Sequence, residues 1–329
     1  MRGLWVESQD GKNVASVRDI PEDSLPAGEV LVRVEYSSLN YKDGLAVTGK
    51  GKVVKGYPWV PGIDLAGVVV ESQSPVWKKG DPVVVTGWGV GEKQWGGFAE
   101  LARVKADWLV RLPEGMTLQD SMVIGTAGFT AMLSLMALEE HGAKKEGLPI
   151  LVTGAAGGVG TIAVALLARA GFKVIASTGR TELHPLLQSL GATEIIGRDQ
   201  VGGSSNAPLQ SQRFGGAIDV VGGKTLAQIL PQLAQGASLA ACGLAGGSSF
   251  ETTVFPFILR AVNLLGIESA YCPRDRREQA WNRLRRELPK EVMAKIAHVA
   301  PLEEVPRLSE EILQGKVQGR TVVAVSAKS

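Results

Sequence analysis

The sequence has few cysteines and few histidines. Its 329 residues include two cysteines, Cys242 and Cys272, and three histidines, His141, His184 and His298. Two cysteines exclude a framework of several disulfides and a multi-cysteine zinc site, and no histidine has ligand spacing to another. We therefore expect no metal centre, and we expect the chain to work in a reducing, cytoplasmic setting.

The charge balance and the hydropathy argue against two further classes of protein. Lys and Arg outnumber Asp and Glu by only 35 to 33, so no basic face indicates a nucleic-acid binder. The basic stretch 274–286 also contains acidic residues and an apolar stripe, which favours a solvated amphipathic helix over an anion site. Residues 1–13 lack the apolar core of a signal peptide, and no apolar run is expected to span a bilayer. We expect neither a nucleic-acid nor a membrane partner.

A glycine-rich turn stands between an apolar run and an apolar helical pattern. Residues 150–152 are apolar, residues 154–160 read GAAGGVG, and residues 162–167 repeat apolar side chains at helical spacing. Glycines allow positive φ and close backbone approach, and a helix start offers unpaired N–H groups to a pyrophosphate. The pattern A-x-G-x-x-G at 155–160 therefore predicts a dinucleotide site. A turn that only packs a helix on a strand has the same pattern, and this alternative stays open.

The periodicity divides the chain into two parts. Short β-type runs fill residues 2–111 and predict a barrel-like β domain. Helical spacing begins near Asp120, and apolar strand-like runs then alternate with helical segments, at 150–153, 173–177, 194–196, 217–221, 238–242 and 262–268. This alternation predicts an α/β fold with a doubly wound parallel sheet. The final strand, 321–325, is expected to return to the first domain, so we predict one domain from 1–120 and 288–329 and a second from 121–287.

The end of the second predicted strand lacks the acidic residue that binds the ribose of NAD. The chain instead reads Ser177, Thr178, Gly179, Arg180. A guanidinium with neighbouring hydroxyls suits a 2′-phosphate, so NADPH is predicted rather than NADH. The alternative, that Arg180 only decorates a turn, stays open. Arg198, which follows the third strand, is a second candidate for a phosphate or adenine contact.

Small residues follow the fifth predicted strand, where the nicotinamide half of the cofactor would lie. They occupy the stretch 238–247, which reads SLAACGLAGG and contains Cys242. Because the sequence offers this thiol neither a histidine base nor a metal partner, we interpret it as a buried small side chain.

Motifs along nearly the whole chain resemble one family. They are NYKDGLAVTGKG (40–51), PGIDLAG (61–67), TGWGVGEKQWGG (86–97), IGTAGFTAM (124–132), TGAAGGVG (153–160), STGR (177–180), ACGLAGG (241–247) and QGRTVV (318–323). The set resembles the zinc-free medium-chain dehydrogenase/reductase superfamily, more narrowly the branch of NADPH-dependent acrylyl-CoA reductases and proteins labelled quinone oxidoreductases. Zinc alcohol dehydrogenases carry a cysteine and a GHE motif where this chain has SSLNYKD and Gly62, Ile63, Asp64. Losing these ligand positions disfavours alcohol oxidation and leaves hydride addition to a polarised C=C bond.

The resemblance implies a fold and a reaction. The fold is a GroES-like β-barrel catalytic domain with a Rossmann domain. The reaction is NADPH-dependent reduction of an α,β-unsaturated acyl-CoA, acrylyl-CoA becoming propionyl-CoA. Lys50, Lys52, Lys55 or the stretch 274–286 would meet the phosphates of CoA. The alternatives are an NADPH:quinone or enone oxidoreductase and a non-catalytic NADPH-binding protein.

The same resemblance implies site residues and an assembly. Tyr41 would line the nicotinamide site and offer its hydroxyl, and Asn40 would donate to the enolate oxygen, although water and backbone N–H groups could serve instead. The implied NADPH contacts are Tyr41, Ala156, Gly157, Gly158, Val159, Ser177, Thr178, Gly179, Arg180, Arg198, Leu244, Ile258 and Ser269. The last strand of the sheet, 262–268, is expected to pair in a homodimer.

Overall fold

The computed structural model describes residues 1–202 and 207–326, and the chain forms two compact units. Unit 1 comprises Met1–Thr126, Ala270–Glu278 and Ile296–Ser329, and unit 2 comprises Ala127–Ser269 and Gln279–Lys295. These bounds differ from the expected domains at three segments, because 270–278 and 121–126 belong to unit 1 and 288–295 belong to unit 2. The first difference has a local cause. The buried Arg277 guanidinium donates to the carbonyl and hydroxyl oxygens of Thr86, both at 2.8 Å, which holds its segment to unit 1.

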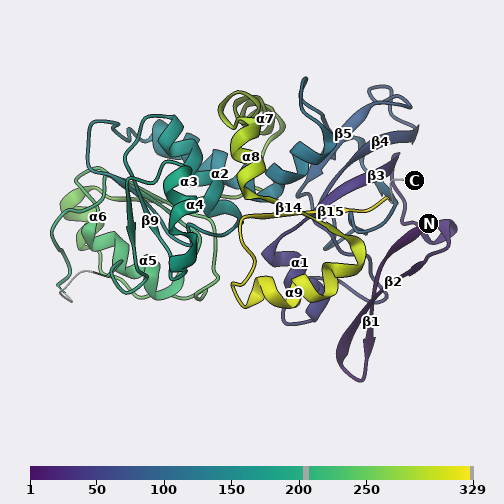
Figure 1. Cartoon of the computed structure of the whole chain (residues 1–329), viewed down its shortest axis with the longest axis horizontal. Helices are drawn as coiled ribbons and strands as arrows, with labels where there is room; N and C mark the ends of the chain where they lie inside the picture. The colour runs from purple at the N-terminus through teal and green to yellow at the C-terminus, as the bar shows by residue number, and fades with distance from the viewer. Residues whose placement is uncertain (203–206, 327–329) are drawn as a thin grey trace. The chain divides into compact units, whose positions relative to one another are not determined.

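Unit 1 is built on a sheet that has seven strands within the described residues (Figure 1). The strand order is β14-β15-β3-β4-β5-β7, and β6 also pairs with β3. Only antiparallel pairs occur among these strands apart from β14 with β15. The bounds are β3 (Val30–Leu39), β4 (Asp64–Ser72), β5 (Pro82–Thr86), β6 (Leu101–Val104), β7 (Val110–Arg111), β14 (Ala297–Pro301) and β15 (Arg320–Ala324). Because β15 pairs with β3, the carboxyl-terminal chain returns to the first unit, as expected from the sequence.

A hairpin and two helices complete unit 1. The hairpin is the antiparallel pair β1 (Arg2–Gln9) and β2 (Lys12–Asp19). The helices α1 (Tyr41–Thr48) and α9 (Val305–Leu313) lie side by side (Figure 1). Short 3₁₀ turns are η1 (Glu22–Ser24), η2 (Ala106–Trp108) and η5 (Leu302–Glu304).

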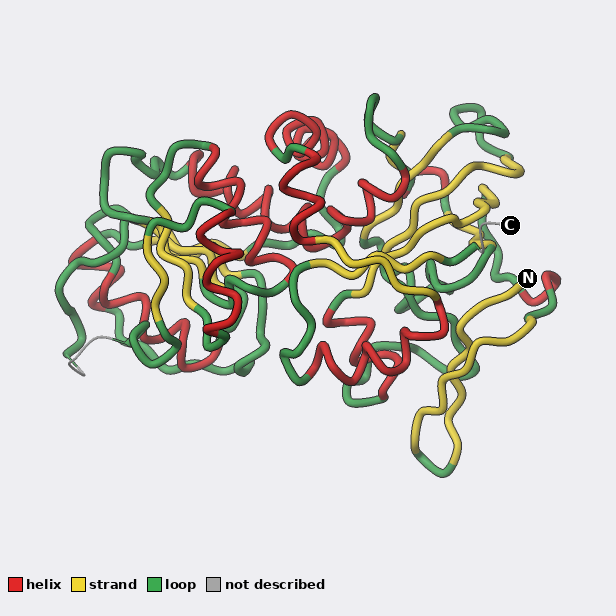
Figure 2. The backbone as a smooth tube through the Cα atoms, viewed as in Figure 1, coloured by secondary structure: helices red, strands yellow, loops and turns green. Residues whose placement is uncertain are grey.

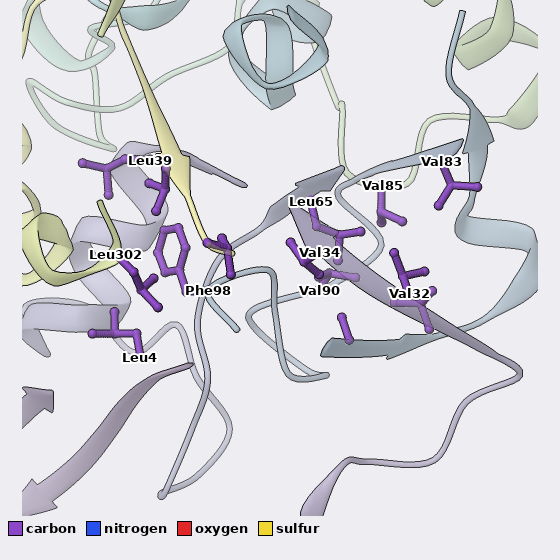
Figure 3. Packing of buried hydrophobic residues seen from close by; sticks show 14 of the residues in the cluster. Leu4, Val32, Val34, Leu39, Leu65, Val83, Val85, Val90, Phe98 and Leu302 are labelled. Atoms are coloured by element: carbon purple, nitrogen blue, oxygen red, sulfur yellow. The ribbon is translucent and has the colours of Figure 1, made fainter. Parts of the chain in front are cut away.

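The core of unit 1 follows from alternation along its strands. Val32 and Val34 of β3 are fully buried while Arg33 between them is exposed, as the two-residue period of a strand requires. Figure 3 shows these valines close to Leu65 of β4 and Val83 of β5. Each such burial contributes about 1.5–3 kcal/mol of apolar transfer free energy. The sheet that carries the candidate residues of unit 1 therefore rests on a well-filled core.

Unit 2 contains a parallel sheet with six strands among the described residues, ordered β10-β9-β8-β11-β12-β13. Numbered from β8, this order is 3-2-1-4-5-6, the arrangement of doubly wound dinucleotide folds. The strands are β8 (Ile150–Val152), β9 (Val174–Ser177), β10 (Glu194–Ile196), β11 (Gly216–Asp219), β12 (Ser238–Ala241) and β13 (Asn263–Gly266). All six lie within or overlap the predicted runs, so the α/β prediction is confirmed.

Helices flank this sheet (Figure 2). They are α3 (Gly158–Arg169), α4 (His184–Ser189), α5 (Gly223–Ile229) and α6 (Phe255–Arg260), with the 3₁₀ turns η3 (Thr181–Leu183) and η4 (Leu230–Gln232). The helix α8 (Lys290–Ile296) contacts α4, where Lys295 Nζ donates to the Ser189 carbonyl oxygen at 3.3 Å. A further helix, α7 (Arg274–Glu287), begins in unit 1 and ends in unit 2. It is the helix predicted from the basic stretch.

The long helix α2 (Leu118–Glu140) corrects one expectation from the sequence. Over its 23 residues it is long and apolar enough to cross a membrane, whereas no such run was expected. Its most apolar window is 94% buried inside the protein, as in the core helix of a globular fold. Gly125, with φ +50° and ψ −159°, interrupts the helix and divides it into two parts.

Candidate functional site

The predicted dinucleotide turn connects β8 to α3 at the carboxyl end of a central strand. Gly154 has φ +55°, a conformation that favours glycine. A Cβ atom on Gly160 would lie 2.3 Å from the Gly154 carbonyl oxygen, so the helix packs on the turn only with glycine at this position. A Cβ on Gly157 would meet only that same oxygen, at 3.3 Å. Gly160 therefore serves packing, while Gly157 leaves the backbone open at the start of α3.

The second predicted element, residues 177–180, is tied to this turn. Arg180 Nη2 donates to the Ala156 carbonyl oxygen at 2.7 Å, and the Ala155 amide donates to the Ser177 carbonyl oxygen at 3.1 Å. The Thr178 hydroxyl accepts from the Arg180 amide at 3.1 Å, and the side chains of Ser177 and Thr178 are buried. The two predicted phosphate-binding segments thus form one connected surface.

Two arginines lie together beside this surface. A Cβ on Gly179 would lie 3.0 Å from Arg198 Nε, so the side chain of Arg198 packs over this glycine. Burial lowers the pKa of Arg180, Glu182 opposes the change, and the nearby charge of Arg198 lowers the pKa further. Two cations close enough to repel one another are the arrangement that an added phosphate dianion would stabilise.

Three of the predicted contacts lie elsewhere in unit 2. Leu244 follows β12 and is 58% exposed, Ile258 is on α6 and is 68% exposed, and half-buried Ser269 follows β13. They belong to the β12 and β13 side of the sheet, whereas the glycine turn and the arginines gather around β8 and β9. The predicted cofactor residues of unit 2 therefore form two groups.

Asp219, at the end of β11, was not singled out in the sequence. Its buried carboxylate accepts from the Thr153 hydroxyl and from the amides of Val221 and Gly222. These bonds hold the ends of two neighbouring strands beside the glycine turn. The nearby thiol of Cys242 has its pKa raised to about 12 by burial and by the charge of Asp219, so it stays protonated at neutral pH.

Asn40 and Tyr41 lie together at the start of α1 in unit 1. Asn40 is the N-cap residue, and its backbone amide donates to Asp43 Oδ2 at 2.9 Å. Tyr41, the first helical residue, is 37% exposed. The Asn40 side chain is buried, with Nδ2 donating to Asp64 Oδ2 at 2.8 Å and Oδ1 accepting from Arg320 Nη1 at 3.2 Å.

A buried polar network surrounds Asn40. Asp43, Asp64 and Arg320 are each at most 2% exposed. Burial, and then the charge of Asp64, raises the pKa of Asp43 to about 7, although its hydrogen bonds with Asn40 and the Ile63 amide oppose the change. Burial lowers the pKa of Arg320, and the two carboxylates oppose that effect. Two carboxylates and one guanidinium thus share an interior site.

Sequence reasoning missed most of this network. Thr126 also belongs to the network, because its amide and its hydroxyl donate to Asp64. Thr126 lies in the IGTAGFTAM motif and Arg320 in the QGRTVV motif, and the sequence assigns neither residue a role. Asp43 sits three residues after an N-cap asparagine, which is a local capping signal.

Three lysines were considered as contacts for the phosphates of CoA. Lys50 pairs with Glu310 at 2.5 Å, while Lys52 and Lys55 are exposed.

In the described part of the chain, 1–202 and 207–326, no group of three or more His, Cys, Asp or Glu side chains is placed to hold a metal ion. This finding concerns side-chain geometry alone.

Known proteins match both units. Residues 26–114 match the family model described as alcohol dehydrogenase GroES-like domain, and residues 158–286 match zinc-binding dehydrogenase. The acrylyl-CoA reductase AcuI of Ruegeria pomeroyi is 51% identical over 321 residues, covering 98% of this chain and 97% of that protein. The Bacillus subtilis protein YhfP, provisionally named a quinone oxidoreductase, is 46% identical over 308 residues, covering 93% of each.

Solved structures agree with these relatives. The YhdH oxidoreductase of Salmonella enterica in complex with NADP has a TM-score of 0.97 and 51% identity, covering 99% of this chain and all of that one. Bacillus subtilis YhfP, solved with NAD bound, has a TM-score of 0.94 and 44% identity, covering 98% of both chains. The chain therefore belongs to the medium-chain dehydrogenase/reductase superfamily, in the branch that contains the acrylyl-CoA reductases.

Proposed function

We propose that the protein is an NADPH-dependent reductase that converts the C=C bond of an α,β-unsaturated acyl-CoA, acrylyl-CoA, to the saturated thioester, propionyl-CoA. The observation that carries the substrate is the 51% identity, over nearly the full length, with a protein named acrylyl-CoA reductase. The substrate is a small molecule, and the proposal includes no nucleic-acid or membrane partner.

The residues of unit 2 fit NADPH. Within α3, all of which the structure describes, the first turn carries no acidic side chain, so its N–H groups present an uncompensated positive end. The open backbone at Gly157 gives a pyrophosphate room to approach. Arg180 and Arg198 would hold the 2′-phosphate, with the hydroxyls of Ser177 and Thr178 beside them. The remaining proposed contacts are Tyr41, Ala156, Gly158, Val159, Gly179, Leu244, Ile258 and Ser269.

When bound, NADPH supplies a hydride to the β-carbon of the enoyl thioester, and the α-carbon then takes a proton. We propose Tyr41 as the side chain that donates a hydrogen bond or this proton, because its hydroxyl is on a partly exposed residue at a helix start. Asn40 is proposed to donate to the enolate oxygen. Its Nδ2 donates to Asp64 Oδ2 at 2.8 Å and makes longer hydrogen bonds, of 3.3–3.5 Å, to Ser38 and Asp43, so a bond to the enolate oxygen would replace one of the longer bonds.

We further propose the organisation of the molecule. Unit 1 would be the catalytic domain and unit 2 the NADPH-binding domain. Exposed apolar side chains near the sheet-edge strand β13 support a homodimer that buries them, namely Phe250, Val254, Phe255, Ile258, Leu259 and Leu264. The free cysteines, Cys242 and Cys272, support a reducing, cytoplasmic location.

An isotope experiment tests the reaction. Acrylyl-CoA and NADPH deuterated at C4 of the nicotinamide are incubated with the protein, and the product is analysed by mass spectrometry. We expect propionyl-CoA that carries deuterium at C3, because the hydride goes to the β-carbon. Absence of propionyl-CoA would contradict the proposal.

A second candidate function is reduction of a quinone or enone, which the provisional name of YhfP favours. It needs the same NADPH residues but no contact with the phosphates of CoA, so free CoA added to the assay should compete only with an acyl-CoA substrate. Unchanged enone reduction in the presence of free CoA would favour this candidate. Binding of NADPH without turnover of any of these substrates would favour the non-catalytic alternative.

A further inference from the structure

We propose that Asp64 and Arg320 form a positioning clamp that fixes the break in α2 to the first turn of α1 and so places Tyr41 for the reduction. The proposal rests on the proposed function, since it concerns how Tyr41 is held for that reaction. The clamp is defined as Asp64, Arg320 and the Ser38 hydroxyl that connects them. All of its residues belong to unit 1.

The break in α2 leaves backbone groups that need partners. At Gly125 the backbone leaves the helical conformation, so the carbonyls before it and the N–H groups after it cannot all pair within the helix. Arg320 Nε donates to the Val123 carbonyl oxygen at 2.9 Å, on the side before the break. Asp64 accepts from the Thr126 amide at 2.9 Å and from the Thr126 hydroxyl at 2.5 Å, on the side after it. One charged side chain thus caps each side of the break.

The same two charges hold the residues that precede Tyr41. Asp64 Oδ2 accepts from Ser38 Oγ at 2.6 Å and from Asn40 Nδ2 at 2.8 Å. Arg320 donates to Ser38 Oγ at 2.9 Å, to Asn40 Oδ1 at 3.2 Å and to the Leu39 carbonyl oxygen at 3.3 Å. The Ser38 hydroxyl therefore accepts from the guanidinium and donates to the carboxylate. Residues 38–40 cannot shift without breaking bonds to both charges.

Close packing makes the arrangement specific. A Cβ on Gly125 would lie 2.6 Å from Asp64 Oδ2, 2.6 Å from Ser38 Oγ and 2.7 Å from Arg320 Nη2. The helix break thus lies directly against all three members of the clamp. Because a buried charge that loses its partners is costly, these side chains have little freedom to rearrange separately. Asp64 and Arg320 are positioning residues here, since both are buried and both contact Asn40, the residue before Tyr41.

Hydrogen exchange tests the structural half of the proposal without requiring activity. In Asp64→Asn the amides of residues 41–48 should exchange about tenfold faster than in the native protein, because the N-cap residue loses its anchor. Ser38→Ala, which removes only the connecting hydroxyl, should show a smaller change of the same kind and serves if Asp64→Asn does not fold. Ser121→Ala is the matched control, since this buried hydroxyl bonds within α2 and not to the clamp. Unchanged exchange over 41–48 in Ser38→Ala and Asp64→Asn would overturn the proposal.

A double-mutant cycle tests the functional half. Asp64→Asn should lower kcat with acrylyl-CoA by about tenfold in the native background and by a clearly smaller factor in Tyr41→Phe, because the contribution made through Tyr41 is then already lost and only the one made through Asn40 remains. The Kd for NADPH should change little in either variant. Equal factors in the two backgrounds, or full activity of Tyr41→Phe, would overturn the positioning role. A native protein that does not reduce acrylyl-CoA would instead overturn the proposed function, and hydrogen exchange would still decide whether the clamp holds α1.

Discussion

Replacing Arg180 by alanine is expected to weaken NADPH binding far more than NADH binding. The guanidinium donates to the Ala156 carbonyl oxygen and lies near Arg198, so it fixes the turn and supplies positive charge at the proposed phosphate position. A hydrogen bond that involves a charged group contributes about 1.5–3 kcal/mol. At about 1.4 kcal/mol for each factor of ten, losing one such bond raises the Kd for NADPH by roughly 10- to 150-fold. NADH lacks the 2′-phosphate and loses only the ordering of the turn.

Both affinities can be measured by the fluorescence of the bound dihydronicotinamide at one fixed ionic strength. Arg180→Lys keeps the charge without the fork of donors and should fall between the native protein and Arg180→Ala. Arg213→Ala is a matched control, because this arginine bonds to Gln200 and Gln232 away from the turn. Equal losses of NADPH and NADH affinity in Arg180→Ala would refute the reasoning for the cofactor.

Three further predictions concern packing, pH and assembly. Gly160→Ala should lower the free energy of unfolding, measured by urea denaturation, by about 1–3 kcal/mol, because the added Cβ would lie 2.3 Å from a backbone oxygen. Gly157→Ala should lower it by less, because its Cβ would lie 3.3 Å from the same oxygen. A larger loss of stability in Gly157→Ala than in Gly160→Ala would contradict this reasoning. The pKa of Asp43 is raised from 3.8 to about 7, so the folded state favours the protonated carboxyl group. The free energy of unfolding should therefore decrease as the pH rises from 4 to 7, by up to about 1.4 kcal/mol per pH unit. In Asp43→Asn, the free energy of unfolding measured by urea denaturation should no longer depend on pH in this range. An unchanged pH dependence in this variant would show that other groups cause it. Val254→Asp should halve the mass measured by light scattering if the 63%-exposed valine lies in a homodimer interface; an unaltered dimer would place the interface elsewhere.

The layout of unit 2 could be predicted because its signals are local. Apolar runs such as 150–152 and 238–241 carry strand propensity, and the glycine turn marks where a strand passes into a helix. The crossover rule for parallel strands then leaves few possible strand orders. The proposed NADPH residues of this unit were chosen for the same reason, because the fingerprint and the STGR stretch are short segments at strand ends.

The network of unit 1 could not be predicted, because its partners are far apart in the chain. Arg320 bonds to Val123, and Asp64 bonds to Thr126, only after β15 and β4 have been placed in the sheet. Apolar spacing runs through Gly125 without interruption, so periodicity predicts one continuous helix where the structure has a break. A glycine inside a helical pattern is a signal of such a break, although it does not say which residues will cap it.

The most direct test of the account is a paired assay of NADPH consumption, with acrylyl-CoA in one arm and a simple benzoquinone in the other. We predict a kcat/KM at least about tenfold higher with acrylyl-CoA, because a CoA substrate contributes binding energy that a small quinone lacks. Quinone turnover far above acrylyl-CoA turnover would contradict the account.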